Sequence, residues 1–328
     1  MTTPPGLPTE LKAALDAKLQ GLSRHDAAER AARISETYRG GGSSIAIRNE
    51  ADALAYALAR MPATYAAVSA SLNALGEIRP DFAPQSLLDV GAGPGTAAWA
   101  AAETWPSLTR FELFDANTAL RELALELARD STHLREMNYR LGEARTTLGN
   151  AGAADLLIAS YVIGEMGEVE QRALADLMWR KTRDTLVVVE PGTPTGYARI
   201  IALREQLIAA GAHVAAPCPH DEKCPLQKPD WCHFTQRLPR SQAHKQIKGA
   251  ELPFEDEKFS YVALCRDPLA SRPARVLAQP DVGKVEVTAK LCMPGGVTTA
   301  RVRRRDKEGY ARARRWRWGD GVSSSSRP

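Results

Sequence analysis

Apolar runs alternate with amphipathic stretches through the middle of the chain. Short apolar runs at 86–90, 110–115, 155–161 and 185–190 are each followed by a stretch whose apolar residues recur at helical spacing. Strands that alternate with helices are typical of a doubly wound parallel sheet with helices on both faces. Two later runs, His213 to Ala216 and Phe259 to Leu264, are expected to be the last two strands and to pair antiparallel. The sequence therefore predicts an α/β domain.

The first 80 residues are expected to be helical. Apolar residues recur at a spacing near 3.6 in 7–32 and 51–61, and good helix formers dominate both segments. Pro62 predicts a break before a further helix that runs to about residue 75. The segment from Tyr38 to Ser44 is rich in glycine and serine. A phosphate-contacting loop is one interpretation of it, and a plain linker is the favoured one.

A glycine-rich turn follows the first strand of the α/β domain. Glycines at 91, 93 and 95 separate that strand from an alanine-rich helix. Glycine lets the backbone approach a ligand where any Cβ would collide, and the start of the helix offers free N–H groups. We therefore predict a nucleotide-like ligand. The residues expected to bind it in this turn are Asp89, Gly91, Ala92, Gly93, Pro94 and Gly95.

The glycine spacing favours S-adenosylmethionine (SAM) over NAD. The dinucleotide fingerprint places its third small residue one position after Gly95, where this chain has Thr96. Asp115 ends the next strand, 24 residues after Gly91, and is expected to bind the ribose hydroxyls of SAM. Ser160, at the end of a later strand, faces the same edge of the sheet and is also expected to line the cofactor site.

A long insertion separates the last two strands and far exceeds the usual hairpin loop. It holds Cys218, Cys224 and Cys232 among prolines, and a metal would organise so long a loop. These cysteines lack the tight spacing of zinc knuckles, so an iron–sulfur cluster is favoured over a Cys₃His zinc site with His220 or His233. A set of free cysteines without metal is the third possibility.

A cluster needs a fourth thiolate, and the chain offers two. Cys265 lies in a run that is apolar throughout, so core packing is its expected role. Cys292 ends the strand 284–292, in which apolar and polar residues alternate strictly, and points away from the apolar face. The predicted metal ligands are therefore Cys218, Cys224, Cys232 and Cys292.

The segment from residue 271 is expected to be a small basic β-unit. Strands at 284–292, 297–304 and 310–318 predict a β-meander or OB-like barrel, a kind of fold that often binds oligonucleotides. Residues 301–328 carry ten Lys or Arg against three Asp or Glu, and cations mixed with aromatic rings suit single-stranded RNA. A solvated basic face is the alternative. The predicted RNA-binding residues are Arg301, Arg303, Arg304, Arg305, Arg312, Arg314, Arg315, Trp316 and Arg317.

Composition adds the cellular setting. The net charge of the 328 residues is +4, so the chain outside 301–328 is slightly acidic and the basic character is local. No apolar run approaches the length of a membrane span and no secretory leader is evident, so we expect a cytoplasmic protein without a membrane partner. Structural disulfides are not expected among five cysteines there. The predicted units are a helical region at 1–80, the SAM domain at 81–270 with its insertion at 214–258, the basic unit at 271–321 and a disordered tail at 322–328.

Taken together, these motifs resemble a known family, the methyltransferase-like assembly factors of the small ribosomal subunit. The resemblance covers nearly the whole chain, through segments 63–66, 88–95, 159–165, 190–194, 218–220 and 318–320. It implies a Rossmann-like, class I SAM-dependent methyltransferase fold and a [4Fe–4S] cluster whose fourth ligand falls on Cys292. It also implies an association with small-subunit rRNA, in a 30S-type particle, during ribosome assembly.

Catalysis stays open at this stage. Methylation of pyrimidine C5 needs a cysteine nucleophile, and segments 159–166 and 190–196 have none. The residues after the fourth strand also lack the Asn/Asp-Pro-Pro-aromatic signature of amine methylation. Tyr161 and Glu165 either position a substrate or form a wall of the cofactor pocket. The hypotheses are an RNA methyltransferase, a SAM-binding RNA-binding assembly factor without turnover, and a zinc-containing small-molecule methyltransferase, which would leave the basic unit without a purpose.

Overall fold

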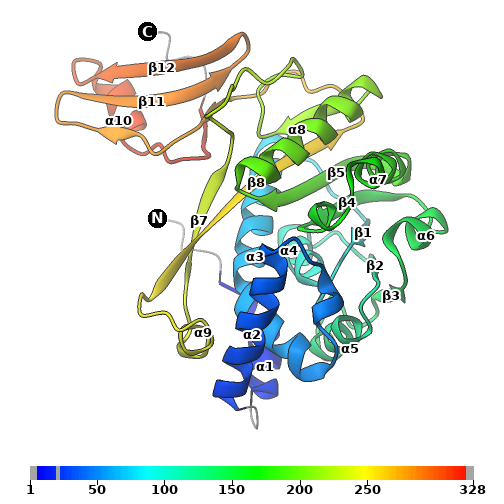
Figure 1. Cartoon of the computed structure of the whole chain (residues 1–328). Coiled ribbons are helices and arrows are strands. Elements are labelled where there is room, and N and C mark those ends of the chain that lie inside the picture. The colour runs from blue at the N-terminus through cyan, green and yellow to red at the C-terminus, as the bar shows by residue number, and fades with distance from the viewer. Residues whose placement is uncertain (1–5, 20–22, 323–328) are drawn as a thin grey trace.

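The computed structural model describes residues 6–19 and 23–322, and its N-terminal part is helical as predicted (Figure 1). The helices are α1 (Thr9–Lys18), α2 (Arg24–Arg39) and α3 (Glu50–Ile78), with a short 3₁₀ turn η1 (Ser44–Ala46) before α3. The break predicted at Pro62 is wrong, because α3 runs through it. Residues on both sides of Pro62 are buried, and this packing outweighs the backbone hydrogen bond that proline cannot make.

The central sheet confirms the α/β prediction. Its order is β3-β2-β1-β4-β5-β8-β6, with β7 paired to β8. The strands are β1 (Ser86–Val90), β2 (Arg110–Asp115), β3 (Asn138–Leu141), β4 (Ala154–Ser160), β5 (Thr182–Pro191), β6 (His213–Ala216), β7 (Phe234–Pro239) and β8 (Phe254–Cys265). Strands β1 to β5 are parallel, and β8 runs antiparallel to β5, β6 and β7.

Helices cover both faces of this sheet, which lies between them as a layer (Figure 1). They are α4 (Thr96–Thr104), α5 (Thr118–Leu127), α6 (Ala144–Gly149), α7 (Glu168–Lys181) and α8 (Pro194–Ala209). Successive strand residues enter opposite cores: Leu87 packs with α3, α4 and α5, and Leu88 packs with α7 and α8. Among the described residues, none of the helices is long and apolar enough to cross a membrane.

The insertion is more regular than the sequence suggested. Strand β7 pairs along its whole length with the first half of β8, and α9 (Gln242–Ile247) lies at the tip of this hairpin. The longest stretch of the insertion without a regular strand or helix is residues 217–233, which contains its three cysteines. The expectation of a long unstructured loop was therefore wrong in extent, because backbone hydrogen bonds order its second half.

The C-terminal unit is an open antiparallel sheet that stands apart from the central sheet (Figure 1). It contains β9 (Ala274–Val276), β10 (Asp281–Val282), β11 (Glu286–Met293), β12 (Gly296–Arg303), helix α10 (Lys307–Ala313) and β13 (Gly321–Val322). The strand predicted at 310–318 is wrong. Asp306 caps a helix there instead, since its carboxylate accepts a hydrogen bond from the Gly309 amide at 2.9 Å. The predicted disordered tail is wrong at its first residue, because Val322 lies in β13 and pairs with Ala274 of β9; the rest of the predicted tail lies outside the described residues.

Candidate cofactor site and cysteine pocket

The glycine turn after β1 has the geometry that its sequence predicts. Gly91, Gly93 and Gly95 have φ values of 70°, 53° and 79°, which side chains rarely adopt. A Cβ on Gly91 would also collide with Val162. The turn leads into α4, and the first N–H groups of a helix have no partner within it.

Asp115 holds this turn in place and borders a cavity. Its carboxylate accepts hydrogen bonds from the Gly93 amide at 2.9 Å and from the Asn117 amide at 2.8 Å. Burial raises the pKa of Asp115 above its usual value. Each carboxylate oxygen has a second lone pair with which it can accept from a ribose hydroxyl. Six predicted residues line the cavity together, namely Gly91, Ala92, Gly93, Pro94, Asp115 and Ser160.

Two predicted cofactor residues lie outside the lining. Gly95 turns the chain into α4, and Asp89 is fully buried beneath the turn. Burial raises the pKa of Asp89 to about 7, although the backbone amide of Ala98 on α4 partly stabilises its charged form. Asp89 therefore acts on the structure of the turn and is not placed to contact a ligand in the cavity.

Sequence reasoning missed the cover of this cavity. The segment interpreted as a linker contributes Tyr38 and Ser44 to the lining. The side-chain amide of Asn117 donates to the carbonyl oxygens of Ser44 at 2.9 Å and Ile47 at 2.8 Å. Tyr139 on β3 was missed as well, and its hydroxyl donates to the Gly93 carbonyl at 2.6 Å.

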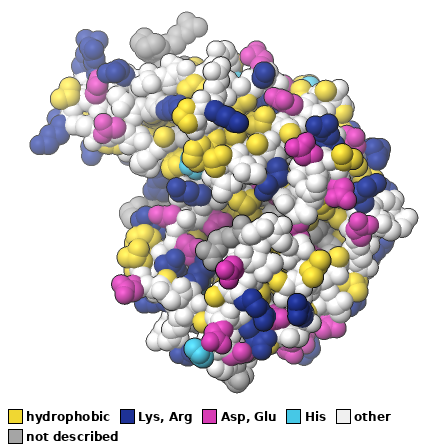
Figure 2. All heavy atoms as spheres, viewed as in Figure 1, with side chains coloured by type: hydrophobic (Ala, Val, Ile, Leu, Met, Phe, Trp, Pro, Cys, Tyr) yellow, Lys and Arg dark blue, Asp and Glu magenta, His cyan; other side chains and the backbone are white. Residues whose placement is uncertain are grey.

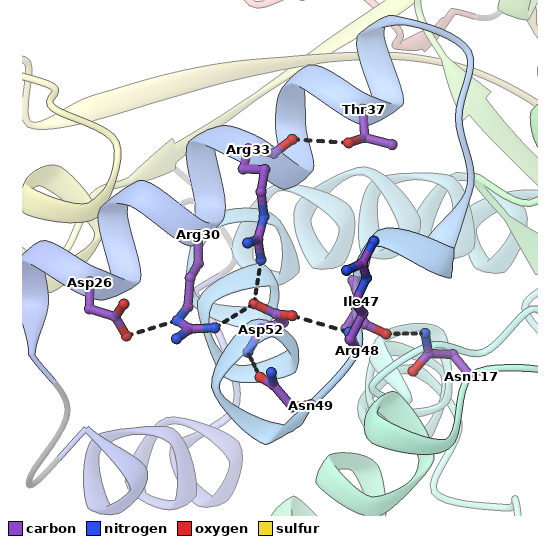
Figure 3. A network of polar contacts seen from close by, with 9 residues as sticks. All are labelled: Asp26, Arg30, Arg33, Thr37, Ile47, Arg48, Asn49, Asp52 and Asn117. Atoms are coloured by element: carbon purple, nitrogen blue, oxygen red, sulfur yellow. Dashed lines mark hydrogen bonds and ion pairs between the residues drawn. The ribbon is translucent and has the colours of Figure 1, made fainter.

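A polar network behind the cover fixes the segment to the helices (Figure 3). Asp52, at the start of α3, has an almost fully buried carboxylate that accepts hydrogen bonds from Arg30, Arg33 and the backbone amide of Arg48. These bonds hold the pKa of Asp52 below its usual value despite burial. The network joins α2 to α3, the two helices that flank the covering segment, and so anchors both ends of the cover.

Tyr161 marks the end of β4 with an unusual backbone. Its φ is 57°, and it is the one non-glycine residue with a positive φ in the described part of the chain. Its hydroxyl donates to Glu257 on β8 at 2.9 Å. Nearby Glu165 borders the same cavity, and burial raises its pKa to about 7. Strain of this kind persists where the surroundings enforce it, often at functional sites.

The four predicted cysteine ligands line one cavity, although they come from two units of the fold. Burial and the neighbouring thiols raise the pKa of Cys232 well above its usual value and that of Cys292 to about 12. The Tyr197 hydroxyl lies 3.1 Å from the Cys224 sulfur. Cys265 lies elsewhere, buried on β8, where its sulfur contacts the carbonyls of His213 and Asp267. The fifth cysteine is thus a core residue, as expected.

Two buried arginines complete this cysteine cavity. Arg204 and Arg275 are 1% and 2% exposed and both line it. Arg275 donates to the carbonyls of Pro217 and Gly319, whereas the Nε of Arg204 has no hydrogen-bond partner. An anionic group with acceptor atoms would satisfy that donor and offset the two buried positive charges.

The donor atoms around the cysteine cavity are thiols and one histidine nitrogen. Within residues 6–19 and 23–322, no three His, Cys, Asp or Glu side chains converge as a site for one metal ion. Zinc needs all its ligands about 2.3 Å from one centre, whereas a [4Fe–4S] cluster takes one thiolate on each of four irons. Four thiols are the number that a cluster needs, and of the two histidines of the zinc alternative His220 lies with its Nε2 3.8 Å from the Cys292 sulfur. His233 does not line the cavity, since it stacks between Trp231 and Trp318.

The predicted RNA-binding arginines form an exposed surface on the C-terminal unit, where Lys and Arg side chains gather at one end of the molecule (Figure 2). Arg301 and Arg303 lie on β12, Arg304 and Arg305 follow it, and the others lie on or after α10. Trp316 is half-buried and packs on the sheet of this unit. Trp318 donates to the His233 carbonyl at 2.8 Å and so attaches the unit to the insertion.

The strand order, the left-handed glycines and Asp115 define a protein of the class I methyltransferase type. The chain belongs to the Rsm22 family, described as "Mitochondrial small ribosomal subunit Rsm22", which matches residues 50–323. The resemblance to methyltransferase-like factors of the small ribosomal subunit is thereby confirmed.

Two kinds of relative match by sequence. The human protein named "Ribosome assembly protein METTL17, mitochondrial" is 30% identical over 291 residues, 81% of this chain and 61% of the human protein. The fission yeast protein named "Rsm22-cox11 tandem protein 2, mitochondrial" is 28% identical over 207 residues, 56% of this chain and 28% of the yeast protein. The chain thus spans less than two thirds of either relative.

Solved structures of methyltransferases resemble this chain in fold alone. A magnesium protoporphyrin IX methyltransferase from Synechocystis has a TM-score of 0.41 and 12% identity, with 62% of this chain and 80% of that chain covered. A precorrin-6y C5,15-methyltransferase from Geobacter metallireducens has a TM-score of 0.40 and 14% identity, with coverage of 60% and 86%. We draw no function from these two.

The expected cytoplasmic location is wrong. The human and fission yeast relatives are named as mitochondrial proteins, and the family itself is described as mitochondrial. The expectation rested on the absence of a long apolar run, and such an absence does not distinguish the cytoplasm from the mitochondrion.

Proposed function

We propose that this protein binds SAM and a [4Fe–4S] cluster and acts on small-subunit ribosomal RNA during ribosome assembly. One observation carries the proposal: three thiols of the insertion and one of the basic unit line a single cavity. A group bound by all four would join the SAM domain to the basic unit, and so would connect the cofactor site to the surface that contacts RNA.

SAM binding is supported by the turn after β1. The three left-handed glycines leave room for a ligand, and the carboxylate of Asp115 stands at the edge of the same cavity. Asp115 would accept from the ribose hydroxyls, and the amides at the start of α4 would face the polar end of the ligand.

The cluster would be held by Cys218, Cys224, Cys232 and Cys292. Bound there, it would supply four iron–thiolate bonds. Because only the folded chain brings the four thiols together, these bonds would add to the stability of the folded state. Arg204 and Arg275 offer buried positive charge to the anionic cluster, and the free Nε of Arg204 offers it a hydrogen bond.

RNA binding is supported by the exposed arginines of the C-terminal unit. Phosphate contacts by Arg release counterions, so affinity should fall steeply with salt. In the test, Arg303, Arg304 and Arg305 are changed together to Glu and binding to 30S-type precursor particles is measured by co-sedimentation. The matched control changes the exposed Arg110, Arg129 and Arg135 to Glu. Loss of binding in the first variant alone is expected, and equal binding by both would overturn the proposal.

Methyl transfer is a second candidate, and one observation favours it. Glu165 borders the cofactor cavity with a pKa of about 7, so it can accept a proton near neutral pH. Transfer of label from SAM to the rRNA of precursor particles would assign a methyltransferase. Stable particle binding without any transfer would assign an assembly factor that uses SAM as a ligand.

A further inference from the structure

A second, larger cavity of about 840 Å³ adjoins the cofactor pocket. Its lining residues come from α2 and α3, from the carboxyl ends of β4 and β5 with the segments that follow them, and from the β7–α9–β8 hairpin. The residues that line both cavities are Tyr38, Tyr56, Thr64, Tyr161 and Glu165. The two cavities are therefore neighbours across a shared wall rich in tyrosine, and the strained Tyr161 stands in that wall.

An unpaired acceptor lies at the inner end of the larger cavity. Glu190, at the end of β5, is 1% exposed and lines the cavity. One carboxyl oxygen accepts from the Nε of Arg199 at 2.9 Å, the backbone amides of Ile163 and Gly164 also stabilise the charged carboxylate, and the Oε1 atom still has no hydrogen-bond partner of good geometry. A buried acceptor without a partner is costly, so a ligand with an N–H group would be stabilised there.

Positive charge is in excess at the rim, where the β7–α9–β8 hairpin and α3 contribute lining residues. Arg240 and Lys248 share the carboxylate of Glu255, and Arg60 pairs with Glu257. Three cations thus face two carboxylates, and all three cations line the cavity. A phosphate at the rim would balance the extra charge.

We propose that the larger cavity binds a single unstacked nucleotide of RNA, with the base against the tyrosines, its amino edge on Glu190 and its phosphate at the cationic rim. The proposal rests on the RNA binding proposed above and specifies which part of the RNA enters the protein. Unpaired bases are commonly recognised by stacking on aromatic rings and by hydrogen bonds to their edges. Adenine, cytosine and guanine carry an exocyclic amine that can donate to Glu190. Uracil offers only its N3–H, which is flanked by two carbonyl oxygens that the carboxylate repels.

The first test compares four nucleoside monophosphates, CMP, AMP, GMP and UMP, by titration calorimetry on the intact protein saturated with S-adenosylhomocysteine. Saturation keeps the nucleotides out of the SAM pocket. At least one amine-bearing nucleotide is expected to bind about tenfold more tightly than UMP, the effect of one hydrogen bond to a charged group. Equal binding of all four, or no binding at millimolar concentration, would overturn the proposal.

Two variants locate the binding. Glu190→Gln keeps the size of the side chain. Its amide oxygen would face Arg199, so its NH₂ group would present a donor to the base. The tighter binding of amine-bearing nucleotides relative to UMP should therefore disappear. Glu205→Gln, an exposed change on α8, is the matched control. Ala32→Trp fills the cavity from an exposed position on α2 and should weaken every nucleotide at least about tenfold. Unchanged affinities in Ala32→Trp would place the nucleotide elsewhere and refute the site.

A third variant separates this inference from the proposed function. The triple change of Arg303, Arg304 and Arg305 to Glu should abolish particle binding and leave nucleotide affinity unchanged, because those residues do not line the cavity. Loss of nucleotide binding in that variant would assign the nucleotides to the basic surface and overturn the cavity site alone.

Discussion

Asn117 donates a hydrogen bond from its side-chain amide to the carbonyl oxygen of Ser44 at 2.9 Å, across 73 positions of the chain. The same amide group donates a second hydrogen bond, to the carbonyl oxygen of Ile47 at 2.8 Å. The side-chain oxygen of Asn117 accepts from the Leu120 amide at 3.0 Å and so caps α5. One side chain therefore closes the cofactor pocket from above and starts the helix behind it.

Replacing Asn117 by Ser should weaken SAM binding about tenfold with little loss of stability. Serine retains the helix cap but is too short to reach both carbonyl oxygens of the cover. Calorimetric titration with SAM measures the effect, and Asn150→Ser at the exposed end of α6 is the control. An affinity equal to that of the control would show that the cover contributes nothing to binding.

Asp115→Ala and Gly93→Val should each abolish measurable SAM binding in a folded protein. The first removes the acceptor for both ribose hydroxyls, at about 1.5–3 kcal/mol for each bond to a charged group. The second forces a β-branched residue to a φ of 53°. Calorimetry and circular dichroism together report binding and folding, with Asp130→Ala as an exposed control. Unchanged affinity in both variants would refute the site.

Cys292→Ser should lose iron as Cys224→Ser does, whereas Cys265→Ser should keep it. The first two thiols line the shared cavity, and the third is packed on β8. Iron and acid-labile sulfide are measured after anaerobic purification. Stoichiometric zinc without sulfide would exclude the cluster, and iron loss in Cys265→Ser alone would show that the fourth ligand was wrongly chosen.

Asp89→Asn should stabilise the protein at pH 8 more than at pH 4. Burial raises the pKa of Asp89 from 3.8 unfolded to about 7 folded. The folded state therefore binds the proton more tightly, so stability is lost as the pH rises from about 4 to 7, by up to about 4 kcal/mol. Asparagine removes this loss. Urea unfolding at both pH values measures it, and an equal effect at both would contradict the shifted pKa. Exposed Asp130→Asn serves as the control.

The parts of the site that the sequence revealed are local. The turn at 91–95 and the acid at 115 follow from residue type and spacing, since left-handed φ values need glycine. The cover at Ser44 could not be predicted, because its bonds to Asn117 join distant segments and no local pattern encodes them. Tyr139 was missed because β3 has four residues, of which only Tyr139 is buried.

In the C-terminal unit a local sequence pattern predicted the wrong element. The alternation of arginine with aromatic residues at 310–318 has the period of a strand, yet α10 forms because Asp306 caps it. The joining of Cys292 to the three cysteines of the insertion was predicted from the orientation of one strand, and the structure places all four at one cavity. Iron at that cavity stays a prediction.

The position of β8 affects how the nascent chain folds. This strand is the last of the central sheet to be synthesised, yet it lies between β5 and β6. Translation from the end of β5 to the end of β8 takes roughly 4 to 15 seconds at the usual rate of elongation. During that interval the apolar edge of β5 has no partner, and such an edge invites pairing with other chains. Newly made protein is therefore expected to aggregate most readily in those seconds, and a chaperone that covers β5 would act before the β7–α9–β8 hairpin completes the larger cavity.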